Sequence, residues 1–368
     1  MKVALVHDDL VQWGGAERVL LGLCEIFEDA PIYTSVVDFS HPILNKKFKN
    51  KKILTSFIQK IPYWKNFYKS FLPLYPIAFE QFDFSKYDCV ISNTTRFAKV
   101  IISKPQTIHI SYCHTPPRFL WNFSEDKQSF LSDKQSFSAS KSLQFFPSYL
   151  HFLKKYDQIS ANRVDYFVAG SKNASLRIKD IYKKDSDVIV PFVDDKFFNS
   201  GENFEGDYYL IVSRLNKYKK VDLAVDVFND LGKRLIIVGS GPMLSLLKNK
   251  ANSNIEFIEN ITDEFLIKLL SGTKALLILG EEDFGLSSLE SQAMGKPVIA
   301  FQKGGVLETV IDSQTGLFFR EQTKTSLKEA IQKFESLEFD KEKCIKNASK
   351  FSFENFKSQF LEIVLKLT

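Results

Sequence analysis

The chain has 368 residues, a length that exceeds one ordinary core and therefore favours two domains. Its hydrophobic and charged fractions, 44% and 25%, are ordinary for a soluble globular protein, and no apolar run approaches the roughly 20 residues of a membrane span. The net charge of +5 is modest, and the sequence lacks recognition-helix, RRM and zinc-finger patterns, which argues against nucleic acid as a partner.

Strand-like and helix-like segments alternate through the first half of the chain. Val3–Val6 is predicted to be a strand, and Ala16–Phe27 an amphipathic helix. Further strands are predicted at Cys89–Ile91, Thr107–Ser111, Tyr166–Ala169 and Val188–Val190. This alternation is typical of a parallel α/β sheet.

The segment Met1–Leu10 contains Asp8 and Asp9, and we interpret it as the first strand rather than as a signal peptide. The four cysteines are scattered without a Cys-x-x-Cys pair, so neither a disulfide framework nor a zinc site is indicated. We therefore expect a cytoplasmic enzyme without a structural metal.

A basic and aromatic segment, Lys46–Leu72, lies within a stretch from Phe39 to Phe79 that contains no Asp or Glu. Lysines mixed with large apolar residues suit an anionic membrane surface, which would make the protein peripheral on the inner face of the membrane. The alternative is a solvated lysine face over an ordinary core, because aromatic residues at helical spacing usually pack inward. The sequence favours the two hypotheses about equally.

Two segments interrupt the alternation. In Asp126–Ser142 the pentapeptide Asp-Lys-Gln-Ser-Phe occurs twice, which predicts a loop or a mobile helical excursion and is too short to indicate a solenoid. Pro191–Asp207 is polar and contains two glycines, so we place the domain boundary there. The predicted domains are residues 1–195 and 205–350.

A second alternation of strands and helices follows this boundary. Its strands are predicted at Tyr209–Val212, Leu235–Val238, Ile255–Ile258, Ala275–Leu279, Val298–Ala300 and Gly316–Phe319. Ligands of such sheets bind at the carboxyl ends of the strands, so the residues just after each strand are candidates for a binding site.

The most informative stretch is the turn between Ala275–Leu279 and a helix predicted at Leu289–Met294. Glu282 and Glu290 are eight residues apart across this turn, with Gly285 between them. A helix start presents unpaired N–H groups and can bind a phosphate, while carboxylates at its rim can bind hydroxyls. The turn therefore suits a sugar attached to a diphosphate. The alternative for Glu290 is a glutamate in the first helical turn that the dipole favours anyway.

Two cationic residues lie just after the strand Tyr209–Val212. Arg214 can bind two phosphate oxygens and Lys219 adds a point charge, so both can neutralise charge on a departing nucleotide diphosphate. Lys220 takes the role of Lys219 if the turn is one residue longer. The alternative is a solvated basic turn.

Two glycine turns also follow strands. Gly14 and Gly15 would let a ligand approach the backbone, although a plain left-handed turn explains them equally well. Gly239 and Gly241 suggest a dinucleotide fingerprint, but its third glycine would fall at Leu244, so the match is incomplete.

These motifs resemble those of retaining glycosyltransferases of family 4, and the resemblance covers most of the chain. The matching motifs, in the family's order, are Gly14–Arg18, Arg214–Asp222, Gly239–Pro242, Glu282–Glu290, Gly295–Ala300 and Gly304–Glu308. The resemblance implies the GT-B fold, an α/β architecture of two doubly wound Rossmann-like domains facing a cleft. The first binds the acceptor and the second the nucleotide-sugar, and residues 351–368 form a helix that crosses back to the first.

The resemblance also implies roles for individual residues. His114, directly after a strand, occupies the place of a histidine that faces the transferred sugar, whereas a lone histidine is usually structural; His7 is a weaker candidate. Glu282 would hold sugar hydroxyls, and Glu281 competes for this role with a spacing that differs by one. Arg118 would meet the acceptor or a phosphate. The implied catalytic set is His114, Glu282, Arg214 and Lys219.

The donor-binding set implied by the resemblance includes Glu290 as the ribose ligand. The residues of this set are Gly14, Gly15, Lys220, Gly239, Gly241, Phe284, Gly285, Leu286, Ser287 and Glu290. Ser240 replaces an acidic residue that is common in the family, and Glu259 replaces a glycine. Both departures lie close to the expected base pocket.

The sequence therefore predicts a metal-independent retaining glycosyltransferase that uses a nucleotide-sugar and no cofactor. The motif set is most similar to that of bacterial mannosyltransferases of surface-polysaccharide assembly, which makes GDP-mannose the expected donor and UDP-sugars the alternative. A glycan or polyprenyl-diphosphate-linked acceptor is expected. The rival hypotheses are a sugar-nucleotide 2-epimerase of the same fold and a non-catalytic nucleotide-sugar-binding protein.

Overall fold

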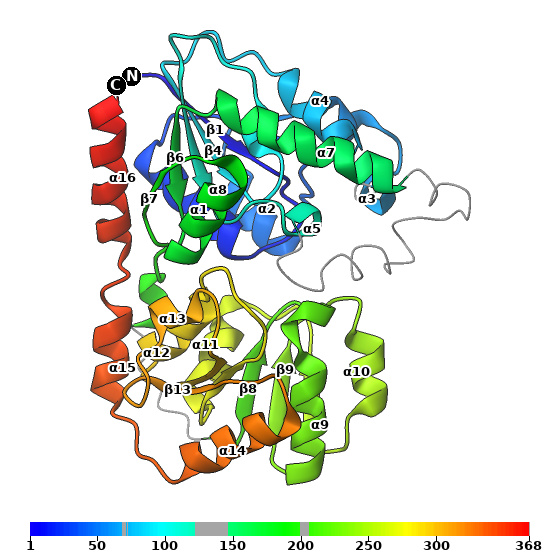
Figure 1. Ribbon diagram of the computed structural model, residues 1–368, viewed down its shortest axis with the longest axis vertical. Coiled ribbons are helices and arrows are strands. Elements are labelled where there is room, and N and C mark those ends of the chain that lie inside the picture. The colour runs from blue at the N-terminus through cyan, green and yellow to red at the C-terminus, as the bar shows by residue number, and fades with distance from the viewer. Residues whose placement is uncertain (68–70, 72, 122–145, 199–205, 368) are drawn as a thin grey trace. The chain divides into compact units, whose positions relative to one another are not determined.

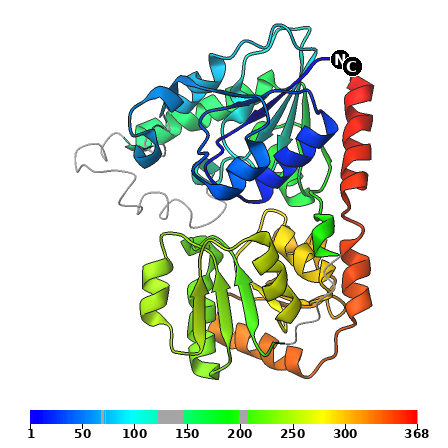
Figure 2. The ribbon, with the colours of Figure 1, turned by 180° about the vertical axis from the view of Figure 1, so that it is seen from behind.

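The computed structural model describes residues 1–67, 71, 73–121, 146–198 and 206–367. The described chain forms two compact units, each a parallel sheet with helices packed against it (Figures 1 and 2). Unit 1 contains the described residues up to Pro191 together with 356–367, and unit 2 contains those of 192–355. The repeat segment Asp126–Ser142 falls outside the described residues.

Unit 1 is built on a seven-stranded parallel sheet in the order β3-β2-β1-β4-β5-β6-β7. The strands are β1 (Val3–His7), β2 (Ile32–Thr34), β3 (Ile53–Thr55), β4 (Cys89–Thr94), β5 (Ile108–Cys113), β6 (Tyr166–Ala169) and β7 (Ser186–Val188). In the register of β1 with β4, His7 lies beside Asn93, so two polar side chains meet at the carboxyl edge of the sheet.

The helices of unit 1 bury an apolar stripe against this sheet. Those described are α1 (Gly15–Ile26), α2 (Pro42–Phe48), α3 (Trp64–Phe67), α4 (Tyr75–Glu80), α5 (Arg118–Trp121), α7 (Phe146–Ser160) and α8 (Lys172–Tyr182), with short 3₁₀ turns η1 (Phe57–Lys60), η3 (Ala98–Val100) and η5 (Ala161–Arg163). In α1 the buried residues Val19, Leu20, Leu23 and Cys24 recur at helical spacing. The C-terminal helix α16 (Phe353–Leu367) packs Phe356 edge-on against Tyr112.

Unit 2 has a six-stranded parallel sheet in the order β10-β9-β8-β11-β12-β13. Its strands are β8 (Tyr209–Val212), β9 (Leu235–Val238), β10 (Ile255–Ile258), β11 (Leu276–Ile278), β12 (Val298–Phe301) and β13 (Gly316–Phe319). Its helices are α9 (Val221–Leu231), α10 (Leu244–Lys250), α11 (Asp263–Gly272), α12 (Leu286–Ala293), α13 (Val306–Thr309), α14 (Lys324–Glu335) and α15 (Lys341–Ala348), with 3₁₀ turns η6 (Asp195–Phe197) and η7 (Lys217–Lys219).

The two parallel α/β sheets confirm the predicted fold class, whereas several details of the elements differ. Strands β2 and β3 were not predicted, because each has only three residues and shows no clear alternation. The last strand of unit 1 lies two residues before the predicted Val188–Val190. Helix α12 begins at Leu286 rather than at Leu289, because its first turn carries two serines and reads as a loop in the sequence.

The structure assigns the apolar residues of the basic segment Lys46–Leu72 mainly to the core. Phe48 and Ile58 are fully buried and Trp64 is 7% exposed, and the last two belong to the apolar cluster that lines the sheet of unit 1. Tyr63 is exposed, and so are Lys46, Lys49, Lys52, Lys60 and Lys65. The described part of this segment thus matches the alternative of an ordinary core with lysines on its surface.

No helix in the described residues is both long and apolar enough to cross a membrane. All four cysteines are buried and free, so none forms a disulfide.

Candidate functional site

The predicted site residues fall into two groups, one at the carboxyl ends of the strands of each unit. Unit 2 holds Arg214, Lys219 and Glu282 together with the glycine turns that surround them. Unit 1 holds His114, which follows β5 directly, and Arg118, the first residue of α5.

The structure brings Lys219 and Glu282 into direct contact. The Lys219 Nζ atom lies 2.5 Å from Oε1 and 2.6 Å from Oε2 of Glu282, so the ammonium group bridges both carboxylate oxygens. The two side chains are 14% and 20% exposed, which leaves the pair partly open to solvent. An ammonium next to a carboxylate places a phosphate-binding charge beside a hydroxyl acceptor, as a sugar phosphate requires.

Glu281, the competitor one residue earlier, is directed to a different partner. Its Oε2 atom is 3.0 Å from Nζ of Lys303. Because adjacent side chains in an extended segment point to opposite sides, Glu282 faces Lys219 while Glu281 faces Lys303. The two acids thus have different lysine contacts, and the role of Glu282 stays a prediction.

Three glycines with no predicted structural role bring this pair together. A Cβ atom on Gly280 would lie 2.5 Å from the carbonyl oxygen of Tyr218 and 2.8 Å from Cα of Lys219, so the turn that carries Lys219 approaches β11 only because Gly280 has no side chain. Gly304 pairs with Glu282 in a short β-bridge, and the Gly305 N–H donates to the Glu282 carbonyl at 2.8 Å.

Gly285 starts helix α12 and adopts a left-handed conformation with φ of 93°. A glycine at this position supplies no side-chain cap. The first-turn amides, which include those of Leu286 and Ser287, are the kind of donors that bind a phosphate at a helix start. Phe284, which precedes the turn, is buried against Phe351 with ring centroids 5.9 Å apart. Because the Phe284 side chain is buried, it holds the turn in place.

The position of Glu290 differs from the expected first helical turn. Because α12 begins at Leu286, Glu290 is its fifth residue and lies in the second turn, where it is 5% exposed. The helix dipole stabilises carboxylates only in the first turn, so it does not explain a glutamate at position 290.

The other two cationic candidates flank the Lys219 turn. Arg214 is exposed two residues after β8. Lys220 has φ of 53° and links η7 to the start of α9, so its first role is to shape the turn. Its left-handed backbone is costly for a residue with a side chain.

Gly239 and Gly241 are required by the protein's own backbone. A Cβ on Gly239 would lie 1.8 Å from the carbonyl oxygen of Ser213, and one on Gly241 would lie 2.7 Å from that of Leu215. The Leu215 N–H also donates to the Ser240 carbonyl at 2.9 Å. This glycine turn therefore packs directly on the loop that carries Arg214, and it positions that loop.

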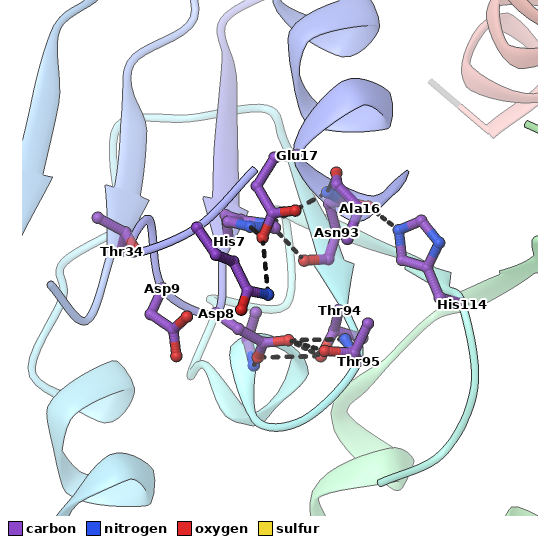
Figure 3. Close-up of polar contacts among 12 residues, drawn as sticks. His7, Asp8, Asp9, Ala16, Glu17, Thr34, Asn93, Thr94, Thr95 and His114 are labelled. Atoms are coloured by element: carbon purple, nitrogen blue, oxygen red, sulfur yellow. Dashed lines mark hydrogen bonds and ion pairs between the residues drawn. The ribbon is translucent and has the colours of Figure 1, made fainter. Parts of the chain in front are cut away.

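In unit 1, His114 belongs to a network that runs along the carboxyl edge of the sheet (Figure 3). Its Nε2 atom lies 2.7 Å from Oδ1 of Asn93, at the penultimate position of β4. The Asn93 Nδ2 atom lies 2.8 Å from the Ala16 carbonyl and 3.0 Å from Nδ1 of His7. Asn93 was not among the predicted site residues, because a lone asparagine inside a strand carries no local motif.

His7, the last residue of β1, is 2% exposed and faces Glu17 of α1, with Nε2 and Oε1 3.6 Å apart. Burial opposes the charged form of the ring, but the negative charge of Glu17, reinforced by Asp8 and Asp9, outweighs it and raises the pKa of His7 above its ordinary value. A protonated His7 can donate from Nδ1 to the backbone carbonyl oxygen of Asn93, 3.1 Å away.

The two acids after β1 have different surroundings. Asp8 accepts hydrogen bonds from the amides of Thr95, Arg96, Phe97 and Ala98. Burial would raise the pKa of Asp8, but the charge of Arg96 and these amides hold it below its ordinary value. Asp9 is paired with Arg96 at 2.5 Å, yet burial dominates and raises the pKa of its carboxyl.

The glycine turn after β1 differs from the expected alternative. Gly14 has φ of −161°, which is extended backbone, and Gly15 is the first residue of α1. Neither is a left-handed turn residue. Arg118 is half-buried at the start of α5. Among the described residues, no three His, Cys, Asp or Glu side chains gather as potential metal ligands, and metal independence stays a prediction.

Residues 192–351 match the family model of glycosyl transferases group 1. The uncharacterized glycosyltransferase MJ1178 of Methanocaldococcus jannaschii is 31% identical over 134 residues, which are 34% of this chain and 38% of that protein. The match thus spans well under half of this relative's own length. Alpha-1,3/1,6-mannosyltransferase ALG2 of Saccharomyces cerevisiae is 27% identical over 84% of this chain and 71% of its own length.

Among solved structures, Anabaena Alr3699/HepE in complex with UDP-glucose superimposes with a TM-score of 0.73 at 16% identity, covering all of both chains. At this identity the likeness concerns the fold. Together with the two parallel sheets, it shows that the chain has the GT-B fold, and residues 192–351 match glycosyl transferases group 1 within that fold.

Proposed function

We propose that this protein is a retaining glycosyltransferase that moves a sugar from a nucleotide-sugar to a hydroxyl group of an acceptor. The observation that carries the proposal is the contact of Lys219 with Glu282, beside a helix that starts at an uncapped glycine. A cationic and a hydroxyl-accepting side chain thus lie side by side within the segment that matches the family, which supports a sugar diphosphate as the ligand.

Each group has a distinct task in the proposed reaction. Lys219 and Arg214 stabilise the negative charge that builds on the departing diphosphate, and the first-turn amides of α12 bind one of its phosphates. Glu282 binds sugar hydroxyls and thereby fixes the reacting carbon. The departing phosphate takes the proton of the acceptor hydroxyl on the face where the new bond forms, so no metal is needed. His114 binds a hydroxyl of the transferred sugar, and Glu290 binds the ribose.

The proposed donor is GDP-mannose, because ALG2, a relative that aligns with most of this chain, is named a mannosyltransferase. UDP-glucose, which is bound in the HepE structure, is the alternative. The acceptor is proposed to be a polyprenyl-diphosphate-linked glycan in bacterial surface-polysaccharide assembly.

The enzyme is proposed to meet this acceptor at the cytoplasmic face of the membrane, attracted by the exposed lysines of Lys46–Leu72. The described apolar residues of this segment are largely in the core, so the attraction rests on charge.

Incubation of the purified protein with labelled GDP-mannose and UDP-glucose tests the activity. A transferase hydrolyses its donor slowly alone and faster with acceptor, whereas an epimerase changes the sugar and a binding protein does neither. We expect slow hydrolysis of GDP-mannose, accelerated by a lipid-linked glycan and insensitive to EDTA. Epimerised sugar, or an unchanged donor across a panel of GDP-, UDP- and ADP-sugars, contradicts the proposal.

Membrane attachment is tested by co-sedimentation with vesicles. Replacing Lys46, Lys49, Lys52 and Lys60 by Gln should weaken binding to anionic vesicles, at about 1 kcal/mol for each lysine near the surface. The matched control replaces four exposed lysines of unit 2, Lys324, Lys328, Lys333 and Lys343, with the same change of net charge. Equal losses in both variants would show non-specific attraction, and equal binding to neutral vesicles would exclude an electrostatic origin.

A further inference from the structure

Asn93 connects three functional segments of unit 1 through a single side-chain amide. The residue is fully buried on β4, and its amide contacts Ala16 at the start of α1, His7 at the end of β1, and His114 after β5 (Figure 3). The hydrogen bonds with Ala16 and His114 hold the buried amide, whereas a protonated His7 donates from Nδ1 to the backbone carbonyl of Asn93 and only lies against its NH₂ group. The two hydrogen bonds therefore fix His114 relative to the start of α1.

The Ala16 contact fixes which way the amide faces. A backbone carbonyl only accepts hydrogen bonds, so the atom 2.8 Å from the Ala16 oxygen must be the NH₂ group of Asn93. The carbonyl oxygen Oδ1 consequently faces His114 at 2.7 Å. Since Oδ1 only accepts, Nε2 of His114 must carry a proton.

This contact selects one of the two neutral forms of the His114 ring. With the proton on Nε2, Nδ1 is the hydrogen-bond acceptor of the neutral ring. The ring is held further by Tyr112, whose ring centroid is 5.0 Å away in an edge-on arrangement, and the His114 N–H donates to the Thr94 carbonyl at 3.0 Å. Position and tautomer are thus both determined within unit 1.

We propose that Asn93 is a positioning residue that holds His114 in its Nε2-protonated form, so that Nδ1 accepts a hydrogen bond from a hydroxyl of the transferred sugar. The role of Nδ1 rests on the proposed function, whereas the tautomer does not. The same amide also contacts the Ala16 carbonyl, so it fixes the position of His114 relative to the turn that contains Gly14 and Gly15. A misplaced ring would weaken sugar binding in the transition state.

The same strand supplies a matched control. Ser92, the neighbour of Asn93, contacts another histidine, with its Oγ atom 2.9 Å from Nε2 of His109. Adjacent residues of a strand point to opposite faces of the sheet, so this buried pair lies on the other side from His114. Ser92→Ala removes a buried contact between a polar β4 side chain and a histidine without touching the network of Asn93.

The direct test is nitrogen NMR of the five histidine rings in the full-length, ligand-free protein at a pH where the ring of His114 is neutral. His114→Gln identifies the His114 signals. We expect the Nε2-protonated form in the wild type and a mixture of both forms in Asn93→Ala. Asn93→Asp should retain the Nε2-protonated form, because its carboxylate still accepts from His114 although it no longer donates to the Ala16 carbonyl. Ser92→Ala should leave the His114 signals unchanged.

The kinetic test separates positioning from a purely structural role. Asn93→Ala should lower kcat by about tenfold to 100-fold with a much smaller change in KM, as expected for a misplaced group. Asn93→Asp should recover part of kcat, and Ser92→Ala should keep it.

Several outcomes overturn the inference. The first is a wild-type His114 protonated on Nδ1, which can be observed without any variant. The second is an unchanged His114 tautomer in Asn93→Ala. The third is full turnover in a variant whose His114 tautomer has changed. An inactive wild type instead removes the proposed function, and in that case the NMR measurement still decides whether Asn93 sets the tautomer.

Discussion

The carboxyl ends of the strands carry polar groups in both units, but the two units hold these groups by different means. In unit 1 they are held by buried side chains: Asn93 is fully buried and His7 is 2% exposed. In unit 2 the contact of Lys219 with Glu282 is partly exposed, at 14% and 20%, and glycines let the surrounding backbones touch. The same sheet architecture therefore supports a side-chain network in one unit and a backbone-built turn in the other.

This difference implies different sensitivities. Removing a buried hydrogen-bonding group leaves its partners unsatisfied, so the network of unit 1 couples function to stability. The charged residues of unit 2 can change with little effect on the fold, whereas its glycines cannot accept a side chain. The four predictions below test this contrast.

Glu282→Gln should give the largest effect on activity. The loss of a charged group used in the transition state is expected to lower turnover about 100- to 1,000-fold, while the partly exposed position leaves the melting temperature nearly unchanged. Steady-state kinetics and thermal unfolding measure the two quantities. Glu281→Gln is the matched control, since it removes the adjacent acid together with its own lysine contact. Similar losses in both variants would contradict the assignment of Glu282.

Lys219→Ala and Arg214→Ala should weaken binding of a nucleoside diphosphate by about 10- to 100-fold, the range expected for a charge-assisted hydrogen bond. Binding of the nucleoside alone should change far less, because it carries no phosphate. Isothermal titration with both ligands measures the difference, and exposed Lys217→Ala in the same turn serves as the control. Equal losses for nucleoside and diphosphate would mean that these residues act through folding.

Gly239→Ala should destabilise unit 2 without removing any polar group. Its φ of 145° and the 1.8 Å approach to the Ser213 carbonyl force the backbone to move, at a cost of about 1–3 kcal/mol or more. Gly232→Ala is the control, since Gly232 also has positive φ but a Cβ there meets open space. Equal unfolding free energies in urea for the two variants would show that the loop contact does not restrict Gly239.

Glu17→Gln should cause a smaller loss of stability that depends on pH. The pKa of His7 is raised in the folded protein, so its stabilising contribution is complete below the ordinary value of 6.5 and is lost as pH rises through the folded value. The difference in unfolding free energy between wild type and variant should therefore be larger at pH 6 than at pH 9. Exposed Glu25→Gln on the same helix should show no such difference. The opposite trend would mean that His7 is neutral when folded.

The sequence by itself determined the fold class and several strands of unit 2. Hydrophobic runs at β8, β9 and β10 predicted those strands with the observed bounds, because buried parallel strands are short apolar runs flanked by turns. The contact of Lys219 with Glu282 was foreseeable as a pair of candidates, since each lies just after a strand and such residues meet at one sheet edge.

The tertiary structure alone decided which neighbours meet. Asn93 becomes important because the β1–β4 register sets it beside His7 and the end of β5 brings His114 to it, and no local pattern encodes such a meeting. Gly280 likewise has no motif, and its role depends on a turn more than 60 residues earlier in the chain. The apolar part of Lys46–Leu72 could not be assigned from its pattern, because an aromatic residue that packs on a core and one that meets a membrane show the same periodicity. Only the tertiary contacts of each aromatic residue distinguish a core residue from a membrane-facing one, and the spacing of residues in the sequence does not show these contacts.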